Sequence, residues 1–397
     1  MAEMQVELAG VRFRNPIIIS SCSLTTHLGK MKRLEEAGAG GLTTKLISRY
    51  PLPHRSNLRV AFHGSSWGVA SDARVLLGDG LELIRSAKRE LSIPIIANFA
   101  GRSADLEIWA QTAKDLEKAG ADMVELDLNA HPEGDLELNV PPNVSLFDDS
   151  SVGQDPIVTG RLVKAVKEAV DIPVLAKLTL RAPDLVAVAQ ACKDNGAAGI
   201  SALNSLRALP GVDITRGGRP IYLGMDTQGT SAVQGPELNS VSLKYTAILS
   251  KTVDLPLISA GGVMTWEHAV ERLMLGARAV GLCSAIYMNG LQALSDCVTG
   301  LENYLDEYGY SGWDRVRGCA LQYIVDLSDV VVRPLKARIA DEQKCRECGA
   351  ICVEKTAPEC LALSTDGDGI RLDENACTGC CLCYWFCPKG AIEMMEQ

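Results

Sequence analysis

Nine of the fourteen cysteines in this 397-residue chain lie between residues 345 and 387. The last of them follow the spacing C-x2-C-x2-C-x3-C-P, in which three thiolates curl around one iron–sulfur cube. The fourth cysteine, set off by Pro388, reaches a second cube. Zinc also takes paired C-x2-C motifs, but a zinc site does not account for a fourth cysteine followed by proline. The spacing therefore predicts [4Fe–4S] binding, and with it electron transfer.

An earlier run of four cysteines, C-x2-C-x3-C-x7-C, has one residue more than the standard spacing. Together the two runs supply the eight ligands that two cubes require, with Cys381 left over. The usual crossing of the fourth cysteines pairs Cys345, Cys348 and Cys352 with Cys387, and Cys377, Cys380 and Cys383 with Cys360. We expect two [4Fe–4S] clusters, and the irregular first run leaves a single cluster as the alternative.

The chain before these cysteines alternates short apolar runs with amphipathic stretches, such as 104–119 and 184–194. Near-continuous apolar runs indicate strands covered on both faces. Eight such runs are present: 16–20, 41–47, 93–99, 123–129, 172–178, 199–204, 255–261 and 279–286. This α/β pattern fits a (β/α)8 TIM barrel or an open, doubly wound sheet. The count of eight favours the barrel, as does the lack of a G-x-G-x-x-G turn after the first strand.

The chain divides into an expected barrel (1–322), an expected linker (323–342) and an expected ferredoxin-like domain with two [4Fe–4S] clusters (343–397). The net charge of -10 argues against nucleic acid as a partner, since phosphate binding needs clustered Lys and Arg. No apolar run approaches the ~20 residues of a membrane span. The amino end lacks a basic stretch followed by an apolar one, so we expect a cytoplasmic protein.

Clusters pass single electrons, whereas most organic substrates take two, and a flavin is the usual converter between them. Residues 259–262, ending strand seven, and 281–284, in strand eight, could hold a flavin phosphate on backbone N–H groups. Tight turns alone would also explain these glycines. Long loops at 131–155 and 205–235 follow strands four and six and are expected to be lids or binding segments.

Five polar side chains end five of the expected strands. Lys45 ends the second strand and Lys177 the fifth, while Asn98, Asp127 and Asn204 end the third, fourth and sixth. A lysine in a barrel strand is seldom buried without a partner. A cation near the N1–C2 edge of a flavin would stabilise its anionic reduced form. Because the carboxyl ends of barrel strands form the active face, we expect the site at this rim.

These residues resemble the dihydroorotate/dihydropyrimidine dehydrogenase family, most closely its pyrimidine-reducing subunits that carry FMN and iron–sulfur clusters. The resemblance covers nearly the whole chain. It rests on Asn15-Pro16, Thr44-Lys45, Glu125-Leu126, residues 152–156, residues 176–179, Asn204, Gly261-Gly262, Cys283-Ser284 and the cysteine-rich end. The combination is specific, because most other FMN barrels lack the cluster domain.

The resemblance implies FMN in the barrel and a small cyclic substrate against it. The residues that we expect to bind FMN are Thr44, Lys45, Lys177, Gly261, Gly262, Cys283 and Ser284. Those expected to face the substrate are Asn98, Asp127, Asn129, Asn204 and Ser205. Electrons would pass through the clusters to or from a FAD/NAD(P)H-binding reductase subunit or a ferredoxin. We expect a homo- or hetero-oligomer.

One segment departs from the family's pattern. The family has Asn-hydrophobic-Ser-Cys-Pro after strand four, and its cysteine is the general acid. Here residues 127–132 read Asp-Leu-Asn-Ala-His-Pro, so Ala130 occupies the acid position and has no proton to give. Either His131 has become the acid, since histidine can donate a proton near neutral pH, or the substrate is no longer a pyrimidine. We expect His131 and Lys45 to be the catalytic residues.

The sequence thus predicts an FMN-dependent oxidoreductase that acts on CH–CH bonds in pyrimidine metabolism, by hydride transfer between flavin N5 and a conjugated C=C bond. Two alternatives stay open. The same scaffold could act on a non-pyrimidine cyclic or aromatic acid. The chain could instead be an electron-transfer subunit of a larger complex, whose flavin only relays charge.

Overall fold

The computed structural model describes residues 3–49, 59–64, 66–71, 74–101, 105–128, 152–227, 231–356, 360–367 and 369–397. The chain divides into two compact units, Met1–Ile324 and Val325–Gln397, which are described separately below. Among the described residues, no helix is both long and apolar enough to cross a lipid bilayer.

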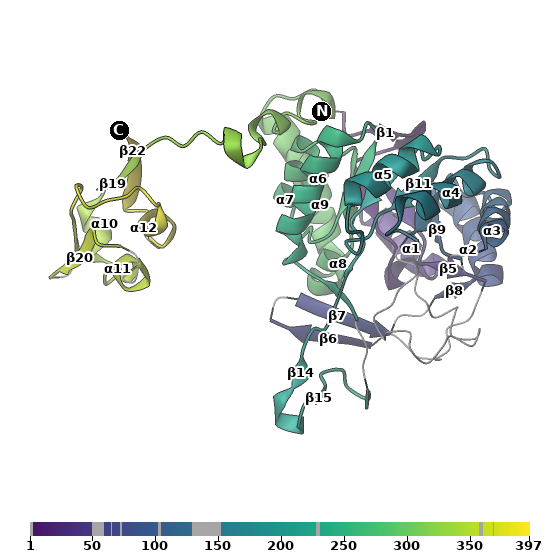
Figure 1. The fold of residues 1–397 in the computed structure, drawn as a ribbon, viewed down its shortest axis with the longest axis horizontal. Helices are drawn as coiled ribbons and strands as arrows, with labels where there is room; N and C mark the ends of the chain where they lie inside the picture. The colour runs from purple at the N-terminus through teal and green to yellow at the C-terminus, as the bar shows by residue number, and fades with distance from the viewer. Residues whose placement is uncertain are drawn as a thin grey trace. The chain divides into compact units, whose positions relative to one another are not determined.

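Eight parallel strands form a closed barrel in the first unit, as predicted (Figure 1). In barrel order they are β3 (Ile17–Ile19), β4 (Gly41–Thr43), β9 (Ile95–Phe99), β10 (Met123–Asp127), β11 (Val174–Lys177), β12 (Gly199–Ala202), β17 (Leu257–Ala260) and β18 (Ala279–Leu282). The pairing of β18 with β3 closes the ring. Nearly every residue of these strands is buried, because side chains fill the barrel on one face and helices cover the other.

Helices alternate with the barrel strands and pack around them. They are α1 (Leu28–Glu36), α2 (Leu77–Glu90), α3 (Leu106–Lys118), α4 (Pro156–Lys167), α5 (Leu185–Asp194), α6 (Leu238–Thr252) and α7 (Trp266–Met274), then α8 (Ser284–Asn289) and α9 (Gln292–Glu307). Asp105, Asp155 and Asp184 accept hydrogen bonds from backbone N–H groups in the first turns of α3, α4 and α5. The amino end adds a hairpin, β1 (Val6–Leu8) and β2 (Val11–Phe13).

Two expected strands were wrong in extent. The strand predicted over 41–47 leaves the barrel at Thr43, and β5 (Ile47–Ser48) pairs instead with the end of β9 and with β8 (Val75–Leu76). The strand predicted over 279–286 ends at Leu282, because Ser284 already begins α8. Apolar composition alone cannot distinguish a buried strand from the first turn of a buried helix.

A second sheet is built from two connections at the carboxyl ends of the barrel strands. Its antiparallel order is β13 (Leu206–Ala208), β16 (Ser231–Gln234), β7 (Ser66–Ser71) and β6 (Arg59–His63). The segment 205–235, predicted as a loop, therefore contributes two of its strands, and also holds the short pair β14 (Val212–Asp213) and β15 (Arg219–Pro220). We call β13, β16, β7 and β6 the rim sheet.

The rim sheet is fixed to the barrel through Trp67 of β7. The Trp67 ring is buried and lies 4.6 Å, between ring centroids, from Tyr287 of α8. Its indole N–H donates a 3.4 Å hydrogen bond to Oγ of Ser284 at the start of α8. The rim sheet is therefore anchored beside the connection that follows the eighth barrel strand.

The second unit is small and has its own core. Its elements are β19 (Leu335–Ile339), α10 (Glu342–Arg346), α11 (Ile351–Thr356), β20 (Leu363–Asp366), β21 (Gly369–Leu372), α12 (Leu382–Trp385) and β22 (Ile392–Glu396). β19 pairs with β22 and β20 with β21, both antiparallel. β19 falls within the segment 323–342 that we expected to be a linker, and its partner is the last strand of the chain.

Candidate functional site

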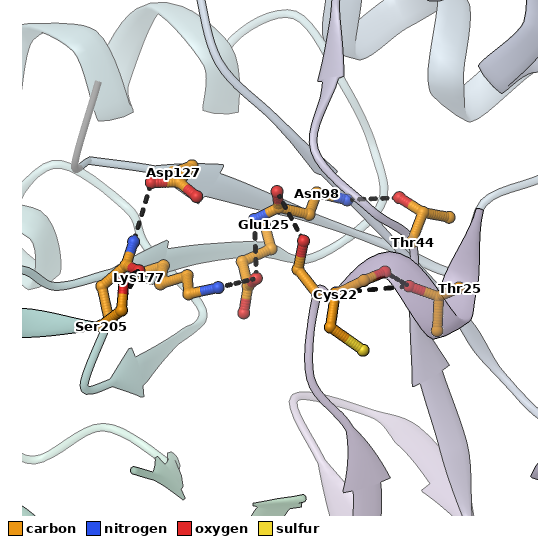
Figure 2. A network of polar contacts seen from close by, with 10 residues as sticks. Cys22, Thr25, Thr44, Asn98, Glu125, Asp127, Lys177 and Ser205 are labelled. Atoms are coloured by element: carbon orange, nitrogen blue, oxygen red, sulfur yellow. Dashed lines mark hydrogen bonds and ion pairs between the residues drawn. The ribbon is translucent and has the colours of Figure 1, made fainter. Parts of the chain in front are cut away.

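Polar side chains from three adjacent strands meet at the carboxyl end of the barrel (Figure 2). The register pairs Asn98 of β9 with Glu125 of β10, and Asp127 of β10 with Lys177 of β11. Register partners on neighbouring strands direct their side chains to the same face of a sheet. The sequence therefore places two carboxylates, an amide and an ammonium group together, on strands that are otherwise apolar.

Glu125 is the centre of this network. Its residue exposure is 2%, and its Oε1 accepts a 2.8 Å hydrogen bond from Nδ2 of Asn98. The same Oε1 lies 3.6 Å from Nζ of Lys177. Asn98 is in turn fixed, because its Oδ1 accepts from Ser21 Oγ and its backbone N–H donates to Oγ1 of Thr44. A carboxylate this deeply buried needs such partners, because an unpaired buried charge costs several kcal/mol.

Lys177 is held in its charged form. Burial is the largest single influence on its pKa and lowers it, but the negative charges of Glu125 and then Asp127 act in the opposite direction. Together with the nearby Cys283 and Cys22, they raise the pKa of Lys177 above its usual value. The site therefore contains a buried, permanently charged ammonium group at neutral pH.

Asp127, Asn204 and Ser205 form a second group on the same rim. Nδ2 of Asn204 donates a 2.9 Å hydrogen bond to Oδ1 of Asp127. Oδ1 of Asn204 accepts from the backbone N–H of Ser205 at 2.8 Å and from its hydroxyl at 3.3 Å. These contacts fix the amide orientation of Asn204. They also place at the rim the carboxylate of Asp127, which can only accept hydrogen bonds.

Two cysteines act electrostatically on Lys177, and a second lysine acts on both of them. Cys22 follows β3 and Cys283 follows β18, and their side chains interact. This interaction is the main reason that the pKa of Cys22 is lowered and that of Cys283 is raised well above its usual value. The charge of Lys45 also favours the Cys22 thiolate.

The loop after β17 packs closely against the start of α6. Gly261 and Gly262 have φ values of 105° and 78°, and a Cβ on Gly262 would lie 2.3 Å from the backbone nitrogen of Asn239. Arg272 of α7, which has a residue exposure of 0%, is hydrogen-bonded to this loop. Its guanidinium donates to the carbonyl of Gly261 and, at 2.8 Å, to Oδ1 of Asn239. Burial lowers the pKa of Arg272 to about 10, which leaves it charged at neutral pH.

In the second unit, Cys345 and Cys352 both lie close enough to Cys348 and Cys387 to interact with them electrostatically. Burial raises the pKa of Cys345, and the neighbouring Cys348 and Cys387 add to that increase. Cys360, Cys377, Cys380, Cys381 and Cys383 line one cavity. A cube takes one thiolate at each of four irons, so its ligands are spread more widely than those of a single ion. Among the described residues, no three metal-binding side chains converge on a single-ion site.

Backbone groups in this unit are directed at the cysteine sulfurs. The N–H of Ala391 donates to Sγ of Cys387 at 3.2 Å, and the N–H of Ala337 to Sγ of Cys377 at 3.5 Å. Such bonds stabilise thiolates and tune cluster potentials. Gly379, at φ 73°, lies against the carbonyl of Leu335, where a Cβ would come within 2.3 Å of the oxygen. The irregular first run contains Ala350 at φ 60°, and α11 begins directly after it, before Cys352.

The structure brings most of the predicted barrel residues together, but not all can be placed. Asn129, Ala130 and His131 lie outside the described residues, as does most of the segment 131–155. Glu125 and Arg272 were not predicted as site residues. A single glutamate in the apolar run of residues 123–127 was the available signal for Glu125. Arg272 sits in an ordinary amphipathic helix pattern and gave no signal.

Known proteins resemble both units. The family model described as dihydroorotate dehydrogenase matches residues 3–305, and a 4Fe-4S binding domain model matches residues 370–393. The catalytic subunit of dihydroorotate dehydrogenase B (NAD(+)) from Pyrococcus furiosus is 32% identical over 80% of this chain and 98% of its own length. The NAD-dependent dihydropyrimidine dehydrogenase subunit PreA from Escherichia coli is 26% identical over 99% of this chain and 96% of its own length.

The support that Arg272 gives to the β17 loop generates a stability prediction. Replacing Arg272 with Met removes the donors to the partly buried oxygens of Gly261 and Asn239. We expect a loss of about 2–4 kcal/mol in the free energy of unfolding, measured by urea titration. Arg161→Met, at an exposed position of α4, is the matched control and should change it by less than ~0.5 kcal/mol. Equal losses in the two variants would contradict the assigned role.

Proposed function

The chain belongs to the dihydroorotate dehydrogenase family, and we propose that it is an FMN-dependent oxidoreductase that transfers hydride between flavin N5 and a conjugated C=C bond of a cyclic substrate. The proposal is carried by one observation: a buried, charged Lys177 lies at the barrel rim that also bears the loops after β17 and β18. The appended 4Fe-4S match supports exchange of electrons with a partner.

The residues present fit a bound FMN. Gly261 and Gly262 carry no side chains and follow β17, and Ser284, which is bonded by Trp67, follows the neighbouring strand β18. These groups suit the phosphate, which backbone N–H groups at such loops commonly bind. Lys177 suits the N1–C2 edge, where the negative charge of reduced flavin accumulates. Thr44, Lys45 and Cys283 would complete the cofactor site. When bound, FMN supplies the conversion between two-electron and one-electron steps.

The substrate would contact Asn98, Asp127, Asn204 and Ser205. The carboxylate of Asp127 accepts hydrogen bonds and carries negative charge, so it favours a ring that presents N–H donors and no carboxylate at this edge. Of the activities that the relatives' names give, this favours a neutral dihydropyrimidine over dihydroorotate, which carries a carboxylate. Asn129 is the remaining residue proposed to contact the substrate. Lys45 and His131 are the proposed catalytic residues.

Electrons would leave or enter through two [4Fe–4S] clusters, with Cys345, Cys348, Cys352 and Cys387 binding one and Cys360, Cys377, Cys380 and Cys383 the other. The E. coli relative is named as a subunit, which supports a separate partner. We propose that this partner is a FAD/NAD(P)H-binding reductase subunit or a ferredoxin.

A second candidate function has a specific observation in its favour. Ala130 stands at the family's acid position and Asp127 at its amide position, so the same electron path could serve a non-pyrimidine cyclic substrate. Such a substrate would still have to tolerate the Asp127 carboxylate.

Cluster stoichiometry tests the electron path. The eight cysteines should bind two cubes, so the protein purified without oxygen should contain about eight iron atoms and eight acid-labile sulfides per chain. Iron and sulfide analysis measures both. Cys381→Ser is the control and should leave both numbers unchanged, because Cys381 belongs to neither group. Four irons per chain would leave only one cluster.

The substrate preference follows from the charge of Asp127. With an artificial reductant, we expect kcat/KM for the neutral ring uracil to exceed that for the carboxylate-bearing ring orotate by at least about tenfold. Asp127→Asn removes the repulsion between the Asp127 carboxylate and the carboxylate of orotate. It should therefore lower the ratio of kcat/KM for uracil to kcat/KM for orotate. Glu107→Gln, at an exposed carboxylate on α3, should leave it unchanged. A preference for orotate would refute the neutral-ring assignment, and turnover of neither ring would favour the second candidate.

The proton donor generates a separate prediction. Hydride addition to a conjugated bond leaves a carbanion-like carbon that must gain a proton, and Ala130 cannot give one. We expect His131→Gln to lower turnover by about a hundredfold or more, the usual scale of general-acid loss. Reduction of the flavin from the cluster side should be unaffected, as followed by absorbance in stopped flow. Normal turnover by this variant would show that His131 is not the acid.

A further inference from the structure

The ion pair between Glu125 and Lys177 is longer than a hydrogen bond. Nζ of Lys177 lies 3.6 Å from Oε1 of Glu125, beyond the ~3.2 Å reach of an N–H···O bond. The same Oε1 already accepts a 2.8 Å bond from Nδ2 of Asn98. The carboxylate therefore compensates the charge of the lysine without occupying its N–H groups.

The position of the Glu125 carboxylate is fixed by a chain of buried contacts (Figure 2). Asn98 has a residue exposure of 0%, donates to Glu125 and accepts a 3.2 Å bond from Ser21 Oγ. Its backbone N–H donates a 3.0 Å bond to Thr44 Oγ1. The carboxylate cannot move onto Lys177 without breaking its bond to Asn98 and leaving a buried amide unpaired, which costs about 1–3 kcal/mol.

Lys177 requires this compensation. Full burial without a partner can lower the pKa of a lysine by up to ~3–5 units, enough to make it neutral at ordinary pH. Glu125 and Asp127 face it from β10, Cys283 from the end of β18 and Cys22 from the loop after β3. The positive charge of Lys45 lowers the pKa of both cysteines and so favours their thiolate forms. With the described residues, Nζ forms no hydrogen bond within ~3.2 Å.

We propose that Glu125 is a positioning residue that keeps Lys177 charged while leaving its N–H groups free for the flavin. The inference rests on the proposed function, which places FMN against Lys177. Glu125 acts only through the lysine. A direct hydrogen bond from Lys177 to Glu125 would use N–H donors that the flavin needs. Without any nearby carboxylate, the buried lysine would be neutral. The 3.6 Å separation satisfies both requirements.

The proposal has a consequence for proton uptake. Two-electron reduction of a flavin to its anionic form takes up one proton, at N5. If Lys177 is already charged, no further proton is needed. If Lys177 is neutral beforehand, the new negative charge draws a second proton onto its Nζ. The number of protons taken up per two electrons therefore reports the charge of Lys177, and the pH dependence of the midpoint potential measures that number.

The experiment compares the complete, cofactor-containing protein with Glu125→Gln, from pH 6.5 to 10. We expect the midpoint potential of the unmutated protein to follow one proton per two electrons above neutrality. In Glu125→Gln, the pH dependence of the midpoint potential should steepen to two protons per two electrons in the upper part of this pH range. The reason is that the proton affinity of Lys177 falls at least about tenfold. Glu107→Gln should show the same pH dependence of the midpoint potential as the unmutated protein. Glu125→Gln/Lys177→Met should return to one proton per two electrons, because it has no lysine at this position to protonate.

Each other outcome decides the question as well. A Glu125→Gln profile identical to that of the unmutated protein overturns the proposal. If Glu125→Gln does not fold, Glu125→Gln/Lys177→Gln should restore folding, because it removes the uncompensated lysine. Failure of that double variant would mean that Glu125 serves packing alone. Absence of FMN from the unmutated protein would instead refute the proposed flavin site, and the inference with it.

Discussion

A charge buried in the mouth of this barrel must be matched by an opposite charge, and the arrangement of the rim follows from that requirement. Lys177 ends one strand, so a carboxylate has to come from a neighbouring strand within reach. β10 provides Glu125 two residues before its end and Asp127 at its end. Because alternate residues of a strand face the same side, both carboxylates point to the lysine side of the sheet. The two-residue spacing of Glu125 and Asp127 in β10 therefore places both negative charges next to Lys177.

Much of this architecture could be predicted from the sequence, because buried parallel strands and amphipathic helices have distinct periodicities. The eight strands and the cysteine spacing depend only on local pattern. The rim sheet was missed, since β7 and β16 pair across a large sequence separation and neither has a pattern that stands out alone. Cys22 could not be linked to the site from sequence for a related reason: Cys283, with which it interacts, lies at the opposite end of the barrel sequence, and β18 pairs with β3 only in the folded barrel.

The two units place charges and hydrogen-bond donors in different ways. In the barrel, the charges of Glu125 and Asp127 surround Lys177. In the second unit, backbone N–H groups directed at Cys377 and Cys387 act on the sulfurs themselves. The extra residue in the first cysteine run is accommodated by the left-handed Ala350 directly before α11, so its spacing reflects a local turn. Sequence spacing alone could not reveal this turn, because alanine seldom adopts that conformation.

The rim sheet also bears on the order in which this protein assembles. The β6–β7 hairpin forms within one short connection, whereas β16 reaches β7 only after most of the barrel strands have been made. Contacts between residues so distant along the chain carry a high loop-closure entropy and contribute strongly to contact order. We therefore expect the hairpin and the barrel to form before the rim sheet is completed. The mouth of the barrel would then remain accessible late in folding, so the proposed flavin could still enter at that stage.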